Sequence, residues 1–345
     1  MTERESDVPK RRDLGFRLLG LLLLVGSFVV AWLIMDFQAF RDNPLNLPEQ
    51  GDTLIVKPGM HLKGIAEQLQ QRGVLDKPRY LVWLGRWLGL DSHIKAGEFH
   101  IDAGTTPGGL LEQLSKGQVV LHSLTLIEGE NFREMMQRVQ ASDALQHTLT
   151  DSKPETVMNA LGHAGEQPEG RFLPETYAFP RGTSDVEFLQ RAWQDMQLYL
   201  QQAWDNRAPD LPLKSSYEAL ILASIVEKET GVAAERAQIA GVFVRRLRKG
   251  MKLQTDPTVI YGMGDSYDGD IRFRDLRVDT PYNTYTRFGL PPTPIAMPGK
   301  EAIQAALHPA DGDALYFVSR GDGSHQFSST LEQHNRAVDR YQRKR

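Results

Sequence analysis

A run without a charged side chain, residues 18–35, limits what the N-terminal part of this chain can fold into. It includes four consecutive leucines, Leu21 to Leu24, and the apolar triplet Phe28 to Val30. Because an α-helix rises about 1.5 Å per residue, the run nearly crosses a bilayer core of roughly 30 Å. We therefore expect residues 18–35 to form a transmembrane helix.

The charges around this run predict its orientation. The basic residues before it are Arg4, Lys10, Arg11, Arg12 and Arg17, whereas Arg41 alone is basic between the run and Gln50. Basic residues stay on the cytoplasmic side of a membrane helix, so we expect residues 1–17 in the cytoplasm and the rest of the chain outside it. A cleaved signal peptide is the alternative. The long polar N-terminal region and the lack of a clear small-x-small site before Asp36 favour an uncleaved anchor.

Composition and spacing exclude several classes of function. The net charge of −4 offers no basic surface, so we expect no nucleic-acid partner. The absence of cysteine excludes disulfides, thiolate catalysis and Cys-ligated zinc. The nine histidines are scattered without HxxxH or HExxH spacing, and no phosphate-binding glycine loop occurs. We therefore expect neither a metal ion nor a cofactor.

Length and element spacing predict an α+β fold behind the membrane helix. A chain of 345 residues suits two or three compact units. Residues 36–52 are expected to form a tether, residues 53–120 a small α+β module, and residues 121–345 a larger mixed α+β domain. In the module the predicted elements are strand 53–56, helices 62–72 and 80–88, strand 100–101 and helix 107–114.

Two tryptophans, Trp83 and Trp87, stand four residues apart in the second helix of the module. This spacing places both side chains on one helical face. We expect the pair to fill the small core of the module, because aromatic side chains supply much buried area. A platform that stacks against sugar rings is the alternative.

The larger domain is expected to contain an intermediate region, residues 121–213, and a catalytic core, residues 214–345. The intermediate region includes the sequence EGRFLPETY at residues 169–177, where a proline keeps the chain extended. Glu175 and Tyr177 in this segment are candidates to line a sugar cleft. An exposed turn explains them equally well.

A buried helix that ends in two acids is the strongest chemical signal. Residues 217–230 are predicted to be helical, and residues 219–226 are almost wholly apolar. Glu227 and Glu229 follow at the C-terminal end, where the helix dipole disfavours negative charge. Catalysis explains this placement, and ordinary helix-end charges are the alternative.

The two acids lie on different faces of that helix. Glu229 continues the face of its bulkiest apolar side chains, and Glu227 a smaller and more polar face. The bulky side chains are Leu222, Ile225 and Val226. Desolvation raises the pKa of a carboxyl group, as a general acid at neutral pH requires. We therefore predict that Glu229 is the acid, and that Glu227 pairs with Arg236 or is solvated.

Polar segments that suit a carbohydrate site follow this helix. Thr, Asn, Gln and Tyr are dense in residues 253–262 and 280–286, and Pro and Gly shape the backbone up to residue 295. Sugar hydroxyls need many donors and acceptors, and sugar faces need aromatic rings. The candidate substrate-binding residues are Gln254, Thr255, Asp256, Tyr261, Tyr282, Asn283, Tyr285 and Thr286.

Four motifs carry a resemblance to a known family. They are ASIVEKET, LQTDPTVIYGMG, TPYNTYTRFGLPP and IAMPG, and the likeness extends from about Thr53 to Asn335. The chain resembles the YceG-like family of endolytic murein transglycosylases. The resemblance implies a LysM-like module at residues 53–120, a periplasmic catalytic domain anchored in the inner membrane, and a catalytic glutamate at Glu229, the second acid of the EKE motif.

The resemblance also implies a substrate and partners. Members of the family cleave the bond between N-acetylmuramic acid and N-acetylglucosamine inside nascent peptidoglycan strands, leaving 1,6-anhydro-muramoyl ends. The expected partners are glycan strands, the inner membrane and peptidoglycan synthases, and the expected consequence is the end of glycan polymerisation.

Counting carboxylates separates the mechanisms. A lytic enzyme needs a single acid and base, because the muramoyl C6 hydroxyl attacks its own C1. A hydrolytic muramidase needs a second carboxylate, for which Asp256 is the candidate, although an acid before a proline also holds a turn. A catalytically silent scaffold that binds glycan is the third hypothesis.

Overall fold

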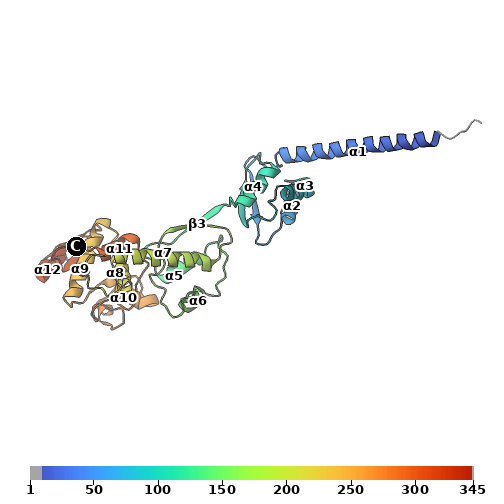
Figure 1. Ribbon diagram of the computed structural model, residues 1–345. Coiled ribbons are helices and arrows are strands. Elements are labelled where there is room, and N and C mark those ends of the chain that lie inside the picture. Colours follow the sequence, from blue (N-terminus) through green and yellow to red (C-terminus); the bar gives the residue numbers. More distant parts are fainter. Residues whose placement is uncertain (1–9, 344–345) are drawn as a thin grey trace, which may run out of the picture. The chain divides into compact units, whose positions relative to one another are not determined.

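The computed structural model describes residues 10–343, and the chain divides into two compact units between Leu121 and His122 (Figure 1). Most of the predicted cytoplasmic segment, residues 1–17, lies outside the described residues. Within them the strands form two-stranded sheets among many helices, which confirms the mixed α+β class.

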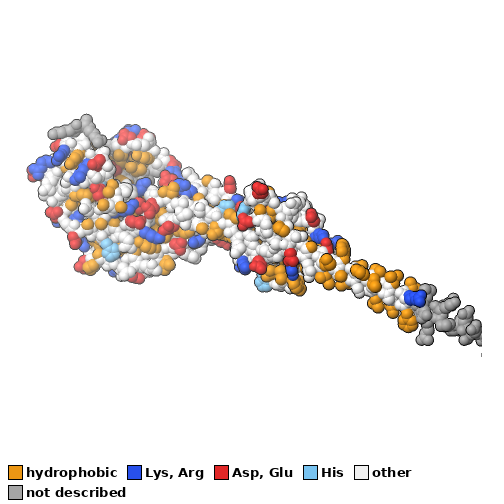
Figure 2. Space-filling model, turned by 90° about the horizontal axis from the view of Figure 1, so that it is seen from above, with side chains coloured by type: hydrophobic (Ala, Val, Ile, Leu, Met, Phe, Trp, Pro, Cys, Tyr) orange, Lys and Arg blue, Asp and Glu red, His pale blue; other side chains and the backbone are white. Residues whose placement is uncertain are grey.

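Helix α1 (Lys10–Asp42) begins the described chain, and Phe16–Asp42 is long and apolar enough to cross a membrane. Its apolar side chains from Phe16 to Met35 are exposed (Figure 2). The helix continues past Met35 to Asp42, so the first seven residues of the segment expected as a tether, 36–42, are helical. The helix persists there because Phe37 and Phe40 pack against Tyr80, with ring centroids 5.6 and 5.5 Å away.

The module in the first unit has the predicted order of strand, helix, helix and strand. Its elements are β1 (Asp52–Val56), α2 (Leu62–Gln71), α3 (Pro78–Trp87), β2 (Gly97–Ile101) and α4 (Pro107–Lys116). β1 and β2 pair antiparallel with Leu54 opposite Phe99, and both side chains are fully buried. Alternate strand residues and the apolar faces of the three helices form one core.

Trp83 and Trp87 do not belong to that core. Their exposed fractions are 55% and 68%, so the prediction that they fill the core of the module is wrong. Leu81 and Leu84 fill it instead, and both are fully buried. The tryptophan face and the leucine face of α3 are adjacent, and residue spacing does not reveal which one meets the core of the module.

The first part of the second unit packs around α7 (Asp185–Asp205), whose N-cap Ser184 forms a capping box with Glu187. Phe172 and Trp193 meet in its core with ring centroids 5.8 Å apart. The other elements here are β3 (Leu121–Thr125), α5 (Phe132–Gln140), α6 (Pro154–Ala160) and β4 (Thr176–Pro180), and β3 pairs with β4.

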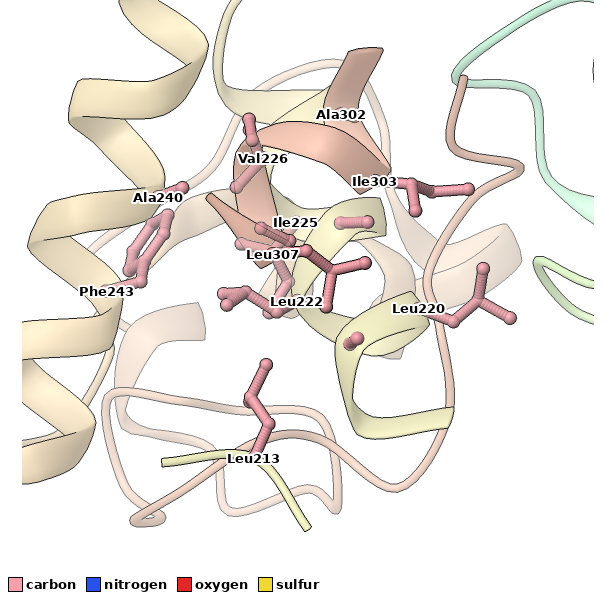
Figure 3. Packing of buried hydrophobic residues seen from close by; sticks show 14 of the residues in the cluster. Leu213, Leu220, Leu222, Ile225, Val226, Ala240, Phe243, Ala302, Ile303 and Leu307 are labelled. Atoms are coloured by element: carbon pink, nitrogen blue, oxygen red, sulfur yellow. The ribbon is translucent and has the colours of Figure 1, made fainter. Parts of the chain in front are cut away.

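The second part of this unit surrounds α8 (Ser216–Glu229), in which residues 219–226 are all buried. Side chains of α9 (Arg236–Arg248) and α11 (Lys300–Leu307) converge on it (Figure 3). The remaining elements are η1 (Ala233–Glu235), α10 (Asp256–Met263), η2 (Gly264–Ser266), η3 (Asp275–Arg277), β5 (Tyr316–Ser319), β6 (His325–Ser328) and α12 (Leu331–Tyr341). β5 and β6 form an antiparallel hairpin, and α12 is capped by Thr330 with Gln333.

Candidate active site

Helix α8 positions the predicted catalytic acid. The helix ends at Glu229, because the next residue, Thr230, is extended. Burial of the whole 219–226 segment fixes the axis of the helix and therefore the point at which its last side chain leaves the core. Such rigid support is what a catalytic carboxyl needs.

The carboxyl of Glu229 contacts Thr255, whose hydroxyl donates a hydrogen bond to Oε1. Burial raises the pKa of Glu229 to about 7, the hydrogen bond from Thr255 lowers it, and the charge of Asp256 raises it. The charges of His325 and Arg246 lower it further. The predicted upward shift of the pKa by desolvation is confirmed, and a carboxyl that titrates near neutral pH can both give and take a proton.

Thr255 is itself held by neighbouring threonines. It is buried at the N-cap of α10, and its N–H donates to Oγ1 of Thr284 at 3.1 Å. Thr258 donates to the carbonyl of Thr255 at 2.8 Å, and its hydroxyl lies 2.9 Å from that of Thr284. These buried contacts fix the hydroxyl that meets Glu229.

Gln254 has a left-handed backbone, with φ at 50°. Its N–H donates to the carbonyl of Thr284 at 3.2 Å, and its side-chain oxygen accepts from Arg246 at 3.5 Å. A positive φ in a residue other than glycine costs free energy and is concentrated at functional sites. The turn that presents Thr255 therefore starts from a strained residue.

Asp256 and Tyr285 form a second polar pair next to Thr255 in the chain. The hydroxyl of Tyr285 donates to Oδ1 of Asp256 at 2.6 Å. Burial, with the hydrogen bond to Asp256, raises the pKa of Tyr285, which therefore stays protonated as a donor. Asp256 is exposed and can meet a substrate.

Tyr261 and Tyr282 connect to a buried acid. Their ring centroids are 4.9 Å apart, Tyr282 hydrogen-bonds to Thr293 at 3.0 Å, and Tyr261 donates to Oε2 of Glu169 at 2.9 Å. Glu169 also accepts the N–H of Phe132 at 3.0 Å, and burial raises its pKa to about 7. This acid therefore links α5 of the intermediate region to α10 of the catalytic core.

Glu227 has the structural role that its helical face predicts. It lies 3.7 Å from Arg236 and accepts the N–H of Gly299 at 2.9 Å. The predicted pairing with Arg236 is confirmed. Glu227 also lines a hollow of about 600 Å³ with three other glutamates, Glu128, Glu130 and Glu134, on the α5 side.

The polar atoms of several candidate substrate-binding residues already form hydrogen bonds within the protein. Tyr177 is only 3% exposed, and its hydroxyl donates to the carbonyl of Leu173. Asn283 is buried, and its side-chain amide donates to three backbone carbonyls, so it holds its loop in place. Glu175 is paired with Lys300, and the hydroxyl of Thr286 is bonded within its own loop to Asp279 at 2.9 Å.

Comparison with known proteins decides the family. A model described as the YceG-like family matches residues 54–340, most of the chain. The chain belongs to the YceG-like family. The solved structure of a putative YceG-like protein from Listeria monocytogenes is 27% identical, has a TM-score of 0.53, and is matched over 84% of this chain and 99% of its own.

Two curated relatives of this YceG-like chain are named endolytic murein transglycosylase. The protein from Bacillus subtilis (strain 168) is 29% identical over 308 residues, which cover 83% of each chain. The protein from Streptococcus pneumoniae serotype 2 is 26% identical over 321 residues, covering 83% of this chain and 57% of the relative.

Sequence reasoning missed three residues of this YceG-like site. Glu169 lies in the EGRFLPETY segment, and no local pattern marks it as buried. Arg246 is 7% exposed and donates to the carbonyls of Leu253 and Leu315, both at 2.7 Å. His325 lies 2.7 Å from Glu235. Among residues 10–343, no group of three or more His, Asp or Glu is placed to hold a metal ion.

Proposed function

We propose that this YceG-like protein is an endolytic peptidoglycan lytic transglycosylase with Glu229 as its acid and base. The observation that carries the proposal is the carboxyl of Glu229, at the end of a helix whose residues 219–226 are all buried, with its pKa raised to about 7. The curated relatives named endolytic murein transglycosylase support the reaction class. The substrate is the bond between N-acetylmuramic acid and N-acetylglucosamine in nascent glycan strands.

One carboxyl balances the protons of this reaction. Protonated Glu229 gives its proton to the glycosidic oxygen as the bond to muramoyl C1 breaks. The carboxylate then takes the proton of the muramoyl C6 hydroxyl while O6 bonds to C1, so the acid is regenerated and no water is consumed. The intramolecular nucleophile gives this step the advantage of proximity.

Thr255 orients the carboxyl in this mechanism. Its hydroxyl donates to Oε1, so Oε1 is the carbonyl oxygen of the acid form, and Oε2 carries the proton towards the substrate. The same hydrogen bond stabilises the carboxylate after proton transfer. Thr255 is therefore proposed as a positioning residue for both steps.

Asp256 is the second carboxylate that a hydrolytic muramidase would need. Its charge acts on Glu229, and it follows Thr255 directly in the chain, so a second carboxylate stands beside the site. Mass spectrometry of purified glycan strands digested by the full-length protein separates the hypotheses. Anhydro-muramoyl ends support the lytic reaction, reducing ends indicate a muramidase, and undigested strands indicate a scaffold.

We also propose that α1 anchors the chain in the inner membrane with residues 1–17 in the cytoplasm and the catalytic domain in the periplasm. The basic flank before the apolar run and the exposed apolar surface of α1 support this topology. There the enzyme would meet strands as synthases extend them, and cleavage would end their polymerisation. A reporter fused after Arg345 that works only outside the cytoplasm should be active, and activity of a cytoplasmic reporter would refute the topology.

The LysM-like assignment of the module at residues 53–120 stays a proposal. Its strand, helix, helix and strand order supports it. Glycan binding by this module can be measured by deleting residues 53–120 and comparing retention of the protein on insoluble cell wall with cleavage of short soluble strands.

A further inference from the structure

The exposed aromatic face of α3 is continuous with the apolar surface of α1. The ring of Trp83 stacks on that of Tyr80 with centroids 5.6 Å apart, and Tyr80 packs against Phe37 of α1. The hydroxyl of Tyr80 also donates to Asp36 at 2.9 Å. Because Asp36 is the first charged residue after the uncharged run, this contact places α3 at the level where α1 leaves the hydrocarbon.

The composition of this face matches the boundary between lipid and water. Trp83 and Trp87 are more than half exposed, and Leu88 beside them is 43% exposed. Arg79 and Arg86 border the tryptophans on the helical wheel, and both are exposed. Tryptophan and tyrosine concentrate at membrane interfaces, where their rings meet the acyl boundary and nearby arginines meet lipid phosphates.

We propose that α3 is an interfacial helix, whose tryptophan face inserts into the headgroup layer of the same membrane that holds α1. Figure 2 shows hydrophobic side chains both along α1 and on the module next to it. Insertion would cover side chains that the fold leaves exposed, and would hold the module close to the bilayer. The inference rests on the proposed anchoring by α1, and it concerns lipid rather than the substrate strand.

Single-cysteine labelling of the full-length chain in phospholipid vesicles tests this directly. The chain has no native cysteine, so a fluorophore attached to Trp83→Cys or Trp87→Cys reports only on that position. Lys63→Cys, exposed at the start of α2, is the matched control in the same module. Val29→Cys in α1 reports on the anchor itself.

Lipids with a nitroxide near the headgroup should quench the labels at positions 83 and 87 strongly and the label at 63 only weakly. A quenched label at 29 with unquenched labels at 83 and 87 would overturn the interfacial helix while leaving the anchor intact. No quenching at 29 would instead show that the anchoring proposal has failed, and the inference with it. Aqueous iodide provides a further comparison. If the label at position 87 is protected from iodide quenching only when glycan strands are added, this face binds sugar instead of lipid.

Discussion

The hydroxyl of Thr255 donates a hydrogen bond to the carboxyl of Glu229 across 26 positions of the chain. One partner ends a buried helix, and the other begins α10 on a strained turn. The contact brings the EKE motif and the LQTDP motif into one site. It also opposes the effect of burial, because the hydrogen bond lowers a pKa that desolvation raises.

Replacing Glu229 tests the mechanism most directly. Glu229→Gln keeps the size and the hydrogen bond from Thr255 but removes the titrating proton, so the turnover number should fall by about 10²–10⁴-fold or more. Glu227→Gln is the matched control. It should retain most activity and lose some thermal stability, since Arg236 loses its charged partner. Near-wild-type turnover by Glu229→Gln on purified strands would refute the assignment.

Removing the Thr255 hydroxyl should change both rate and pH profile. In the wild type, activity should fall as pH rises through about 7, because Glu229 loses the proton it must donate. Thr255→Val removes a hydrogen bond that lowers this pKa, so the alkaline limb should move to higher pH. The turnover number should drop roughly 10- to 100-fold, as the loss of a hydrogen bond to a charged group allows.

Thr255→Ser is the control for that experiment, because it restores the hydroxyl while removing one methyl group. It should recover the pH profile and most of the rate. If Thr255→Val and the wild type share one pH profile, the hydroxyl does not act on Glu229.

Asp256→Asn separates the lytic from the hydrolytic mechanism. Asparagine can still accept the hydrogen bond from Tyr285, so the local structure should survive. Anhydro-muramoyl ends should still form at a reduced rate, because the lytic reaction needs no second carboxylate. Complete loss of product in a folded Asp256→Asn protein, with reducing ends from the wild type, would establish the muramidase instead.

Glu169 predicts how stability depends on pH. Burial raises its pKa from 4.5 to about 7, so the folded state binds more protons than the unfolded state between these values. The contribution of Glu169 to the free energy of unfolding should therefore be fully present below pH 4.5 and fall by about 3 kcal/mol as pH rises through 7. Glu169→Gln should make the dependence shallower in urea titrations from pH 4.5 to 8, and the slope that remains should come from Glu229, whose pKa is also raised to about 7. An unchanged slope would show that Glu169 does not titrate in this range.

Gly170 holds the loop of Glu169 against the segment around Pro294. Its φ is 75°, and an added Cβ would lie 2.5 Å from Cβ of Pro294. Gly170→Ala should therefore cost about 2–5 kcal/mol of unfolding free energy from backbone strain and overlap. Gly165→Ala shares the positive φ, at 83°, but meets no atom within 4 Å, so it should cost only about 1–2 kcal/mol. Equal losses in the two variants would exclude the steric contribution.

Local patterns were sufficient to predict the elements of the module, the helix α8 and the catalytic candidate. The periodicity of α8 identified its buried segment, and desolvation at its end made Glu229 the acid with the raised pKa. The uncharged run predicted the exposed apolar helix α1 in the same way. Such features depend on residues within a few helical turns, because burial of a helical face repeats with the helical period.

Only the tertiary structure decided the contacts between residues that are distant in the sequence, and which helical faces are buried. Glu169 meets Tyr261 across 92 positions, and Tyr177 faces the core rather than the site. Trp83 and Trp87 are exposed because α3 packs into the core of the module through its leucines. Side-chain spacing along one helix or strand shows which of its faces are more apolar. Which face is buried, however, depends on the element that packs against it. The sequence by itself therefore determined Glu229 as the proposed acid, and only the fold determined which residues hold its carboxyl in place.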